Sequence, residues 1–113
     1  MKKICLLLVV FLMCGCSNNY KTINKKEAQK LIEEKDAILV DVRSTLEFQQ
    51  GHINNAVSFP ITTILEDIVL EYEKDTYIIV YCQSGKRSKT AAEGLIEIGY
   101  ENVYDLGSIN NWS

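Results

Sequence analysis

Two nearly continuous apolar runs stand out along the chain, and each has the length of a strand that is buried on both faces. These runs are residues 37–42 and 77–81, and the second leads directly into Cys82. Strands that are apolar at successive positions, rather than at alternate ones, are typical of parallel sheets covered by helices. The pattern therefore predicts two central strands of an α/β sheet, with Cys82 at the carboxyl end of one of them.

Segments whose apolar residues recur at helical intervals lie before, between and after these strands. The capping-box pair Asn24 and Glu27 predicts a helix that begins there and continues to about residue 35. Apolar positions recur at helical intervals over residues 61–72, and a further helix is expected over residues 86–98. The alternation of strands and helices predicts a mainly parallel sheet covered on both sides.

Shorter elements complete the pattern. Residues 56–59 read as a short strand that ends at Pro60, and residues 103–106 read as the last strand. Gly99 is expected to end the preceding helix. Between the first long strand and residue 56 the sequence is polar and includes Gly51, and no helix or strand is predicted there.

The N-terminus has the layout of an export signal. Residues 1–3 are positively charged, and residues 4–13 are apolar but too few to span a bilayer. The following Gly15-Cys16 resembles the lipobox of bacterial lipoproteins, in which a small residue precedes the cysteine that is lipidated and becomes the new N-terminus. Cys14 is a competing acceptor, and an ordinary cleaved signal with incidental cysteines is the alternative.

This reading divides the chain into three parts. Residues 1–15 are the signal peptide, residues 16–22 the lipidated cysteine with a polar tether, and residues 23–113 one domain. We expect the domain to lie in the cell envelope, held by lipid at a membrane surface on the extracytoplasmic side. The formal net charge of −3 becomes −5 once Lys2 and Lys3 are removed. An acidic domain without a basic stripe argues against nucleic acid as a partner.

Cysteine usage directs attention to one residue. Of the four cysteines, Cys5 and Cys14 leave with the signal and Cys16 carries lipid, so Cys82 remains as a free thiol. The sequence has no Cys/His cluster of the kind that holds a metal ion, and we expect neither a metal nor another cofactor.

The segment from Cys82 to Ser88 reads as a strand end, a tight loop and a helix start. The N–H groups and partial positive charge of a helix N-terminus stabilise a thiolate, and Lys86 and Arg87 add cationic charge. Gly85 lets the loop curl so that its amides can face an anion. The segment predicts a nucleophilic sulfur beside an anion cradle, with the sulfur open to solvent. A buried structural cysteine beside a helix cap is the alternative.

The pattern Cys82-x-x-Gly85-x-Arg87-Ser88 resembles the active-site loop of single-domain rhodaneses. Two further stretches match the family in order and spacing. The upstream signature is Asp41-Val42-Arg43, Glu47-Phe48, Gly51-His52-Ile53, Ala56 and Pro60. The closing pattern is Ala91-Ala92, Leu95, Gly99-Tyr100, Asn102-Val103-Tyr104, Leu106-Gly107, Ile109 and Trp112. The resemblance covers residues 23–113 and implies a rhodanese-like α/β fold, with a central parallel sheet of about five strands flanked by helices on both faces.

The resemblance also implies a sulfurtransferase. Cys82 would take the outer sulfur of a small anion such as thiosulfate, form a persulfide, and pass the sulfur to a thiol or cyanide. Arg87 would act with it by binding the oxygens of the donor. The substrate-binding loop would comprise Gln83, Ser84, Gly85, Lys86 and Ser88. Cys82 and Arg87 lie five positions apart, one fewer than in the related phosphatases, which disfavours phosphate chemistry. A non-catalytic module that binds an anion or partner, or senses sulfur, is the alternative.

Four upstream residues are expected to support this loop. Arg43 and Glu47, four apart, are predicted to pair, and Asp41 to brace the strand end by hydrogen bonding. His52 is expected to bond to backbone rather than to activate the thiol. The pair Gly107-Ser108 departs from the two glycines usual in the family, and Ser108 is expected to restrict a turn.

Overall fold

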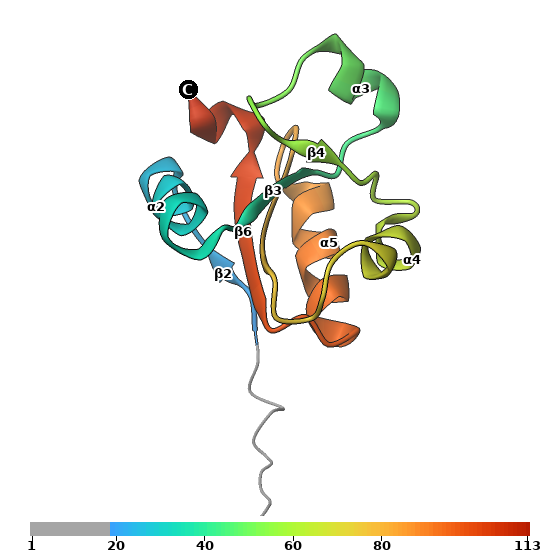
Figure 1. Ribbon diagram of the computed structural model, residues 1–113. Helices are drawn as coiled ribbons and strands as arrows, with labels where there is room; N and C mark the ends of the chain where they lie inside the picture. The colour runs from blue at the N-terminus through green and yellow to red at the C-terminus, as the bar shows by residue number, and fades with distance from the viewer. Residues whose placement is uncertain (1–18) are drawn as a thin grey trace, which may run out of the picture.

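Five parallel strands form the centre of the computed structural model, which describes residues 19–113 (Figure 1). Their order across the sheet is β2-β6-β5-β3-β4, so the strand that ends in Cys82 lies in the middle. The strands are β2 (Lys21–Thr22), β3 (Ile38–Asp41), β4 (Val57–Ser58), β5 (Tyr77–Cys82) and β6 (Asn102–Ser108). The predicted α/β class with a parallel sheet is confirmed.

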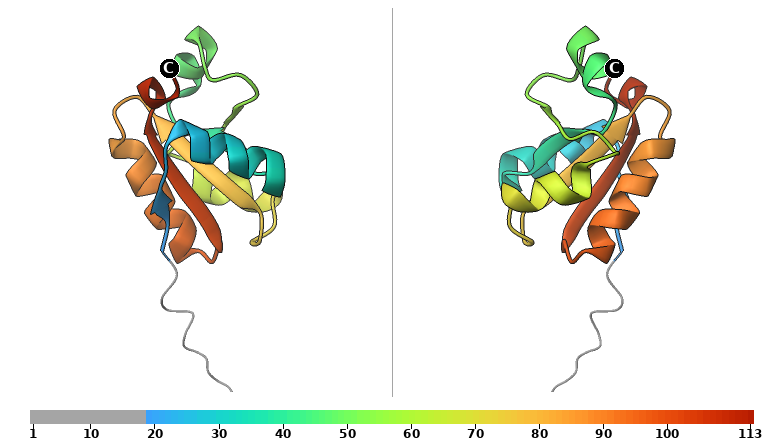
Figure 2. Two further views of the ribbon diagram at one scale, coloured as in Figure 1. Left: turned by 90° about the vertical axis from the view of Figure 1, so that its left-hand side faces the viewer. Right: turned by 90° about the vertical axis from the view of Figure 1, so that its right-hand side faces the viewer.

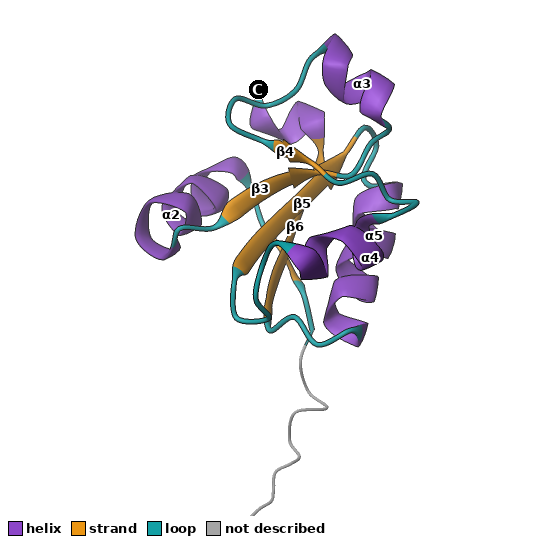
Figure 3. Ribbon diagram, turned by 45° about the vertical axis from the view of Figure 1, so that its right-hand side comes forward, coloured by secondary structure: helices purple, strands orange, loops and turns teal. Residues whose placement is uncertain are grey.

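Helices cover both faces of this sheet. One face carries α2, and the opposite face carries α4 and α5, as the side views show (Figures 2 and 3). Six helical segments are present among the described residues: α2 (Lys25–Lys35), α3 (Thr45–Gln50), α4 (Ile64–Asp67), η2 (Ile68–Leu70), α5 (Lys86–Glu97) and η3 (Ile109–Trp112). The segments η2 and η3 are short 3₁₀ helices.

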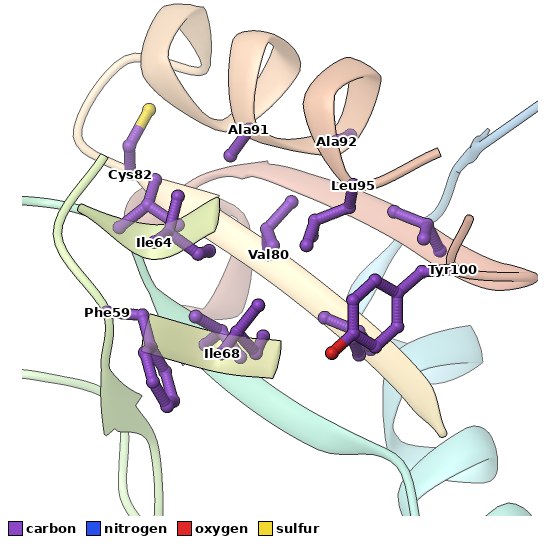
Figure 4. Close-up of a cluster of buried hydrophobic side chains, with 13 residues drawn as sticks. Phe59, Ile64, Ile68, Val80, Cys82, Ala91, Ala92, Leu95 and Tyr100 are labelled. Carbon is purple, nitrogen blue, oxygen red and sulfur yellow. The ribbon is translucent and has the colours of Figure 1, made fainter. Parts of the chain in front are cut away.

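Strand β5 divides its side chains between two cores. Ile78, Val80 and Cys82 pack with α4 and α5, and Figure 4 shows Val80 and Cys82 in that cluster. Ile79 and Tyr81 pack on the α2 side. All five are fully buried, which explains the continuous apolar run, because both faces of a central strand are covered. Burial of each aliphatic side chain contributes about 1.5–3 kcal/mol. The same alternation points Cys82 into the α5 side of the sheet.

The start of α2 and the end of α5 lie where the sequence signals predicted them. The Asn24 side chain accepts from the Glu27 N–H at 2.9 Å, and the Glu27 carboxylate accepts from the Asn24 N–H at 2.9 Å. Gly99 has φ +106° just beyond α5, and the following Tyr100 N–H donates to the Leu95 carbonyl at 3.0 Å. Both predicted ends are therefore confirmed.

The polar stretch after β3 contains a helix that the sequence did not predict. Ser44 and Glu47 cap α3 reciprocally, in the same way as the first helix. Helix α3 has only six residues and no apolar stripe, since Leu46 is 64% exposed and Phe48 packs inward alone. A helix this short depends on its cap and its tertiary contacts, so hydrophobic periodicity does not reveal it.

Two further predictions need correction. Residues 61–72 do not form one helix, because α4 ends after four residues and continues as the 3₁₀ turn η2, with only Ile64 and Ile68 buried. Lys21–Thr22, which the sequence places in the tether, forms edge strand β2 beside β6. A two-residue polar strand has no alternation to detect, and its pairing is decided by the neighbouring strand.

The predicted signal peptide and Cys16 lie outside the described residues, so lipidation stays a prediction. Within residues 19–113, the helices are too short and too polar to cross a bilayer.

Candidate functional site

Cys82 lies at the carboxyl end of the central strand, where the loop of residues 83–85 leads into α5. Its strand neighbours are β3 and β6, and Cys82 is in register with Ser108. Ligands of open parallel sheets bind at this edge, beyond the strand ends. The position predicted for the thiol is therefore where the fold places a binding site.

Backbone amides of the loop converge on the sulfur. The Gly85 N–H donates to Cys82 Sγ at 3.0 Å, and the Ser88 N–H donates at 3.3 Å. Gly85 has φ +99°, a conformation that side-chain-bearing residues rarely adopt, and the Ser88 hydroxyl donates to its carbonyl at 3.1 Å. These N–H groups stabilise negative charge on sulfur, which confirms the predicted inward-facing cradle.

The expectation of an exposed sulfur is wrong for this conformation. Cys82 has 0% exposure, and its side chain closes one end of the core that contains Ile64 and Ala91 (Figure 4). The reason is geometric, because the residue still belongs to β5 and its side chain points into the layer under α5. A donor reaches the sulfur only after the covering groups move.

Arg87 pairs with Glu47 across the mouth of the loop. Its Nη1 lies 2.8 Å from Glu47 Oε1 and its Nη2 lies 3.1 Å from Oε2, a bidentate arrangement. Glu47 Oε1 also accepts from the N–H and hydroxyl of Ser44. The hydrogen bond from Arg87, followed by that from the Ser44 backbone, lowers the pKa of the Glu47 carboxyl to about 2. Glu47 is therefore a carboxylate at neutral pH.

The predicted pair of Arg43 with Glu47 is wrong, because Arg43 binds Asp41 instead. Its Nη2 lies 2.7 Å from Asp41 Oδ2, and its backbone N–H donates to Asp41 Oδ1 at 2.9 Å. Arg43 also reaches the Gly51 carbonyl at 2.6 Å and the Gln83 side chain at 3.4 Å. Both members of the pair are buried, so Asp41 is the hydrogen-bonding brace that the sequence predicted.

His52 does not approach the thiol through a hydrogen bond. Its Nδ1 lies 2.8 Å from the Phe48 carbonyl oxygen, and its ring stacks on the Phe48 ring at 3.7 Å. Within residues 19–113, the groups bonded to Cys82 Sγ are the two loop amides. The backbone-bonding role expected of His52 agrees with these contacts.

Ser108 supports the loop in a way that the sequence did not suggest. Its hydroxyl donates to the Gln83 carbonyl at 2.7 Å and accepts from the Asn110 N–H at 3.0 Å. Its φ is −79°, whereas Gly107 takes the positive φ of +86°. The expected restriction by Ser108 is therefore wrong, since the adjacent glycine makes the turn and the serine ties β6 to the loop.

Tyr81 also has a role beyond the packing that was expected. Its buried hydroxyl oxygen accepts from the Ile53 N–H at 3.1 Å, and burial raises the pKa of this tyrosine. The guanidinium of Arg43 lies 5.9 Å from the ring centroid. Strand position predicts that Tyr81 is buried, but no local signal identifies its distant hydrogen-bond partner.

The remaining loop residues surround the mouth. Gln83, Ser84 and Lys86 are exposed, so the ammonium of Lys86 is available to solvent near the start of α5. The loop therefore combines a buried cysteine sulfur, backbone amides directed at that sulfur, an arginine paired with Glu47, and the solvent-exposed Lys86. This arrangement can bind an anion and, once open, present a nucleophile to it.

Known proteins share this arrangement of elements. Residues 24–113 match the model of the family described as Rhodanese-like domain. The thiosulfate sulfurtransferase GlpE of Coxiella burnetii is 32% identical over 94 residues, covering 82% of this chain and 87% of that protein. The tRNA uridine(34) hydroxylase of Erwinia tasmaniensis is 33% identical over 85 residues, covering 71% of this chain but only 24% of the hydroxylase.

A solved structure gives the same result. The rhodanese-related protein of Thermoplasma volcanium superposes with a TM-score of 0.69 at 32% identity, covering 82% of this chain and 90% of that one. Its strands and helices therefore correspond to those described above over nearly the whole domain. On the family match, the sequence relatives and the shared fold, the chain belongs to the rhodanese-like domain family.

Proposed function

We propose that this protein is a sulfurtransferase that carries sulfane sulfur from a thiosulfate-like anion to a thiol on Cys82. The observation that carries the proposal is the pair of loop N–H groups bonded to Cys82 Sγ, from Gly85 and Ser88. These donors stabilise a thiolate on Cys82 Sγ, the nucleophile that the proposed transfer requires. The similarity to a thiosulfate sulfurtransferase over most of both chains supports the same activity.

The reaction has two steps that share one covalent intermediate. The Cys82 thiolate attacks the outer sulfur of thiosulfate, a new S–S bond forms, and sulfite leaves with the electron pair of the broken S–S bond. An acceptor thiolate then attacks the outer sulfur of the Cys82 persulfide and leaves as a persulfide itself, which regenerates the Cys82 thiolate. Arg87 binds donor oxygens once it is released from Glu47, and Lys86 adds charge at the mouth.

The experiment is intact-mass analysis of the protein after incubation with thiosulfate. We expect the mass of one additional sulfur atom on the wild-type protein, removed again by a small thiol. Cys82→Ser should fold normally and gain no sulfur. A wild-type protein that never gains sulfur from any sulfane donor excludes the proposal.

A second function is favoured by the closed state of the thiol. Cys82 has no exposed surface, which suits a module that binds an anion or a partner without turnover. Such a module would show anion-dependent thermal stabilisation that persists in Cys82→Ser. Persulfide formation on Cys82, followed by repeated transfer of the sulfur to an acceptor thiol, would favour the enzyme over the binding module.

We propose further that the domain is held at a membrane surface by lipid on Cys16, in the cell envelope. The support is the sequence before the domain, with its charged start, short apolar run and Gly15-Cys16. Intact mass of the protein extracted from its own membranes should show acyl chains. A membrane-extracted protein whose intact mass includes no acyl chain would exclude the lipid anchor.

A further inference from the structure

A hollow opens beside Arg87. Its volume is about 410 Å³, and it lies between the start of α3, the β4–α4 connection and the first turn of α5. Pro60 and Ile61 give it an apolar wall, and hydroxyl groups complete its lining, from Ser44, Thr45, Thr62 and Thr63. This volume is in the range of sites that hold small organic molecules, far more than one tetrahedral anion needs.

The charges around the hollow balance each other. Arg87 is paired with Glu47, and Arg43 behind it is paired with Asp41. The Glu47 carboxylate is held in place by Ser44 as well as by Arg87. Lys86 is the cation of the loop that stays exposed and has no ion-pair partner among residues 19–113. A doubly charged anion that binds Arg87 therefore also meets the negative charge of Glu47.

These two features point to a class of donor, on the basis of the sulfurtransferase activity proposed above. We propose that the site prefers a singly charged organic thiosulfonate to the inorganic thiosulfate dianion, with its organic group in the hollow, and that Glu47 sets this preference. The sulfonyl oxygens approach Arg87, and the carbon substituent lies against Pro60 and Ile61. The outer sulfur is then directed toward Cys82 once the covering side chains move.

The chemistry balances without an additional reactant. The Cys82 thiolate attacks the outer sulfur of the thiosulfonate and forms the S–S bond of the persulfide. The bond between that sulfur and the sulfonyl sulfur breaks, and a sulfinate leaves with the electron pair. The product on the protein is the same persulfide that thiosulfate forms, so one mass measurement follows both donors.

The test compares the rates of persulfide formation for thiosulfate, methanethiosulfonate and benzenethiosulfonate in single-turnover experiments. Each rate is divided by the rate of the same donor with a small thiol in solution, which removes its intrinsic reactivity. We expect the normalised rates to rise from thiosulfate to methanethiosulfonate to benzenethiosulfonate. A normalised preference for thiosulfate would overturn the inference.

Glu47→Gln tests the role of charge. Glutamine keeps an oxygen that can accept from Ser44, so the cap of α3 is retained while the negative charge is lost. We expect the ratio of the thiosulfate rate to the methanethiosulfonate rate to rise roughly three- to tenfold, because one repulsive charge is removed at a partly exposed site. Glu93→Gln, an exposed position on α5, should leave the ratio unchanged. An unchanged ratio in Glu47→Gln contradicts the proposed role.

Thr62→Trp tests the hollow. Thr62 is exposed, so tryptophan can fill the hollow without entering the core. The ratio of the benzenethiosulfonate rate to the methanethiosulfonate rate should fall to about one, whereas Thr90→Trp on the exposed side of α5 should preserve it. If both donors slow equally in Thr62→Trp, the organic group does not bind there. If no donor yields a persulfide on the wild-type protein, the sulfurtransferase proposal itself fails.

Discussion

Two arginine–carboxylate pairs lie in this domain, one beneath the Cys82 loop and one across its mouth, and they differ in their exposure to solvent. Arg43 and Asp41 are buried, with side-chain exposures of 6% and 0%. Arg87 and Glu47 are partly exposed, at 37% and 32%. Both pairs have short contacts, 2.7 Å and 2.8 Å, so distance alone does not distinguish them.

The two arginines differ in whether water can replace their carboxylate partner. Water can replace Glu47 around Arg87, so that pair is worth little to stability and can open for an anion. Arg43 has no such replacement, and removal of Asp41 would leave an uncompensated buried charge. The buried pair therefore holds the floor of the site, through the Gly51 carbonyl and the Gln83 side chain, whereas the exposed pair can take part in binding.

Loss of one member of the buried pair should have the largest effect. Asp41→Ala should destabilise the domain by about 3–5 kcal/mol, because Arg43 loses its partner in a site that excludes water. Urea unfolding measures the change, with Asp67→Ala, an exposed aspartate of α4, as the control. A loss below about 1 kcal/mol would show that Arg43 finds solvent and that the two pairs are alike.

Removal of the arginine at the mouth should have the reverse effect. Arg87→Ala should slow persulfide formation from thiosulfate roughly 10- to 100-fold, which corresponds to loss of a charge-assisted hydrogen bond to the donor. The free energy of unfolding should change by less than about 1 kcal/mol. Lys89→Ala, exposed on the same helix, should leave both quantities unchanged. Stability that falls with activity would place Arg87 in the structural class of Arg43.

Deletion of the Tyr81 hydroxyl tests a buried hydrogen bond beside the Arg43–Asp41 pair. Tyr81→Phe removes the acceptor of the Ile53 N–H and should cost about 1–3 kcal/mol, because a buried donor loses its partner. Tyr77→Phe on the same strand is the matched control, since its ring is only partly buried. Equal unfolding free energies for the two variants would mean that the Tyr81 hydroxyl bond contributes nothing measurable.

The smallest expected effect is the acid dependence of the exposed pair. The folded pKa of Glu47 lies at about 2, below its ordinary value of 4.5, so its contribution to stability is complete above pH about 4.5. That contribution is lost as the pH falls from about 4.5 towards 2. The melting temperature of the wild-type protein should therefore fall slightly more than that of Glu47→Gln over this pH interval. Parallel melting curves at every pH would contradict the lowered pKa.

Sequence patterns succeeded where a signal is local. The apolar run of residues 77–81 identified the central strand, and the pair Asn24 and Glu27 identified the first capped helix. The loop from Cys82 to Ser88 was recognised because strand end, glycine and helix start are adjacent in the chain. In each case the residues that determine the structure lie within a few positions of one another, so periodicity or spacing reveals them.

The predictions that failed concern side-chain partners that are not set by neighbouring residues in the sequence. The partner of Arg43 was assigned from a separation of four residues, but Arg43 precedes α3 and its side chain folds back onto the end of β3. The partner of Glu47 is 40 positions away on another helix, and the hydroxyl of Tyr81 accepts from a backbone N–H 28 positions away. Side chains with several possible partners choose among them by proximity in the folded chain.

The parallel α/β class, the place of Cys82 at a strand end and the cradle that follows it could all be predicted from the amino-acid sequence, because hydrophobic periodicity and glycine conformation act over short stretches. The burial of the Cys82 thiol, the pairing of Glu47 with Arg87 and the hydrogen bond from Ser108 to the loop became evident from the folded chain. Those outcomes depend on which distant groups meet when the sheet and its helices pack, and packing is a property of the whole chain.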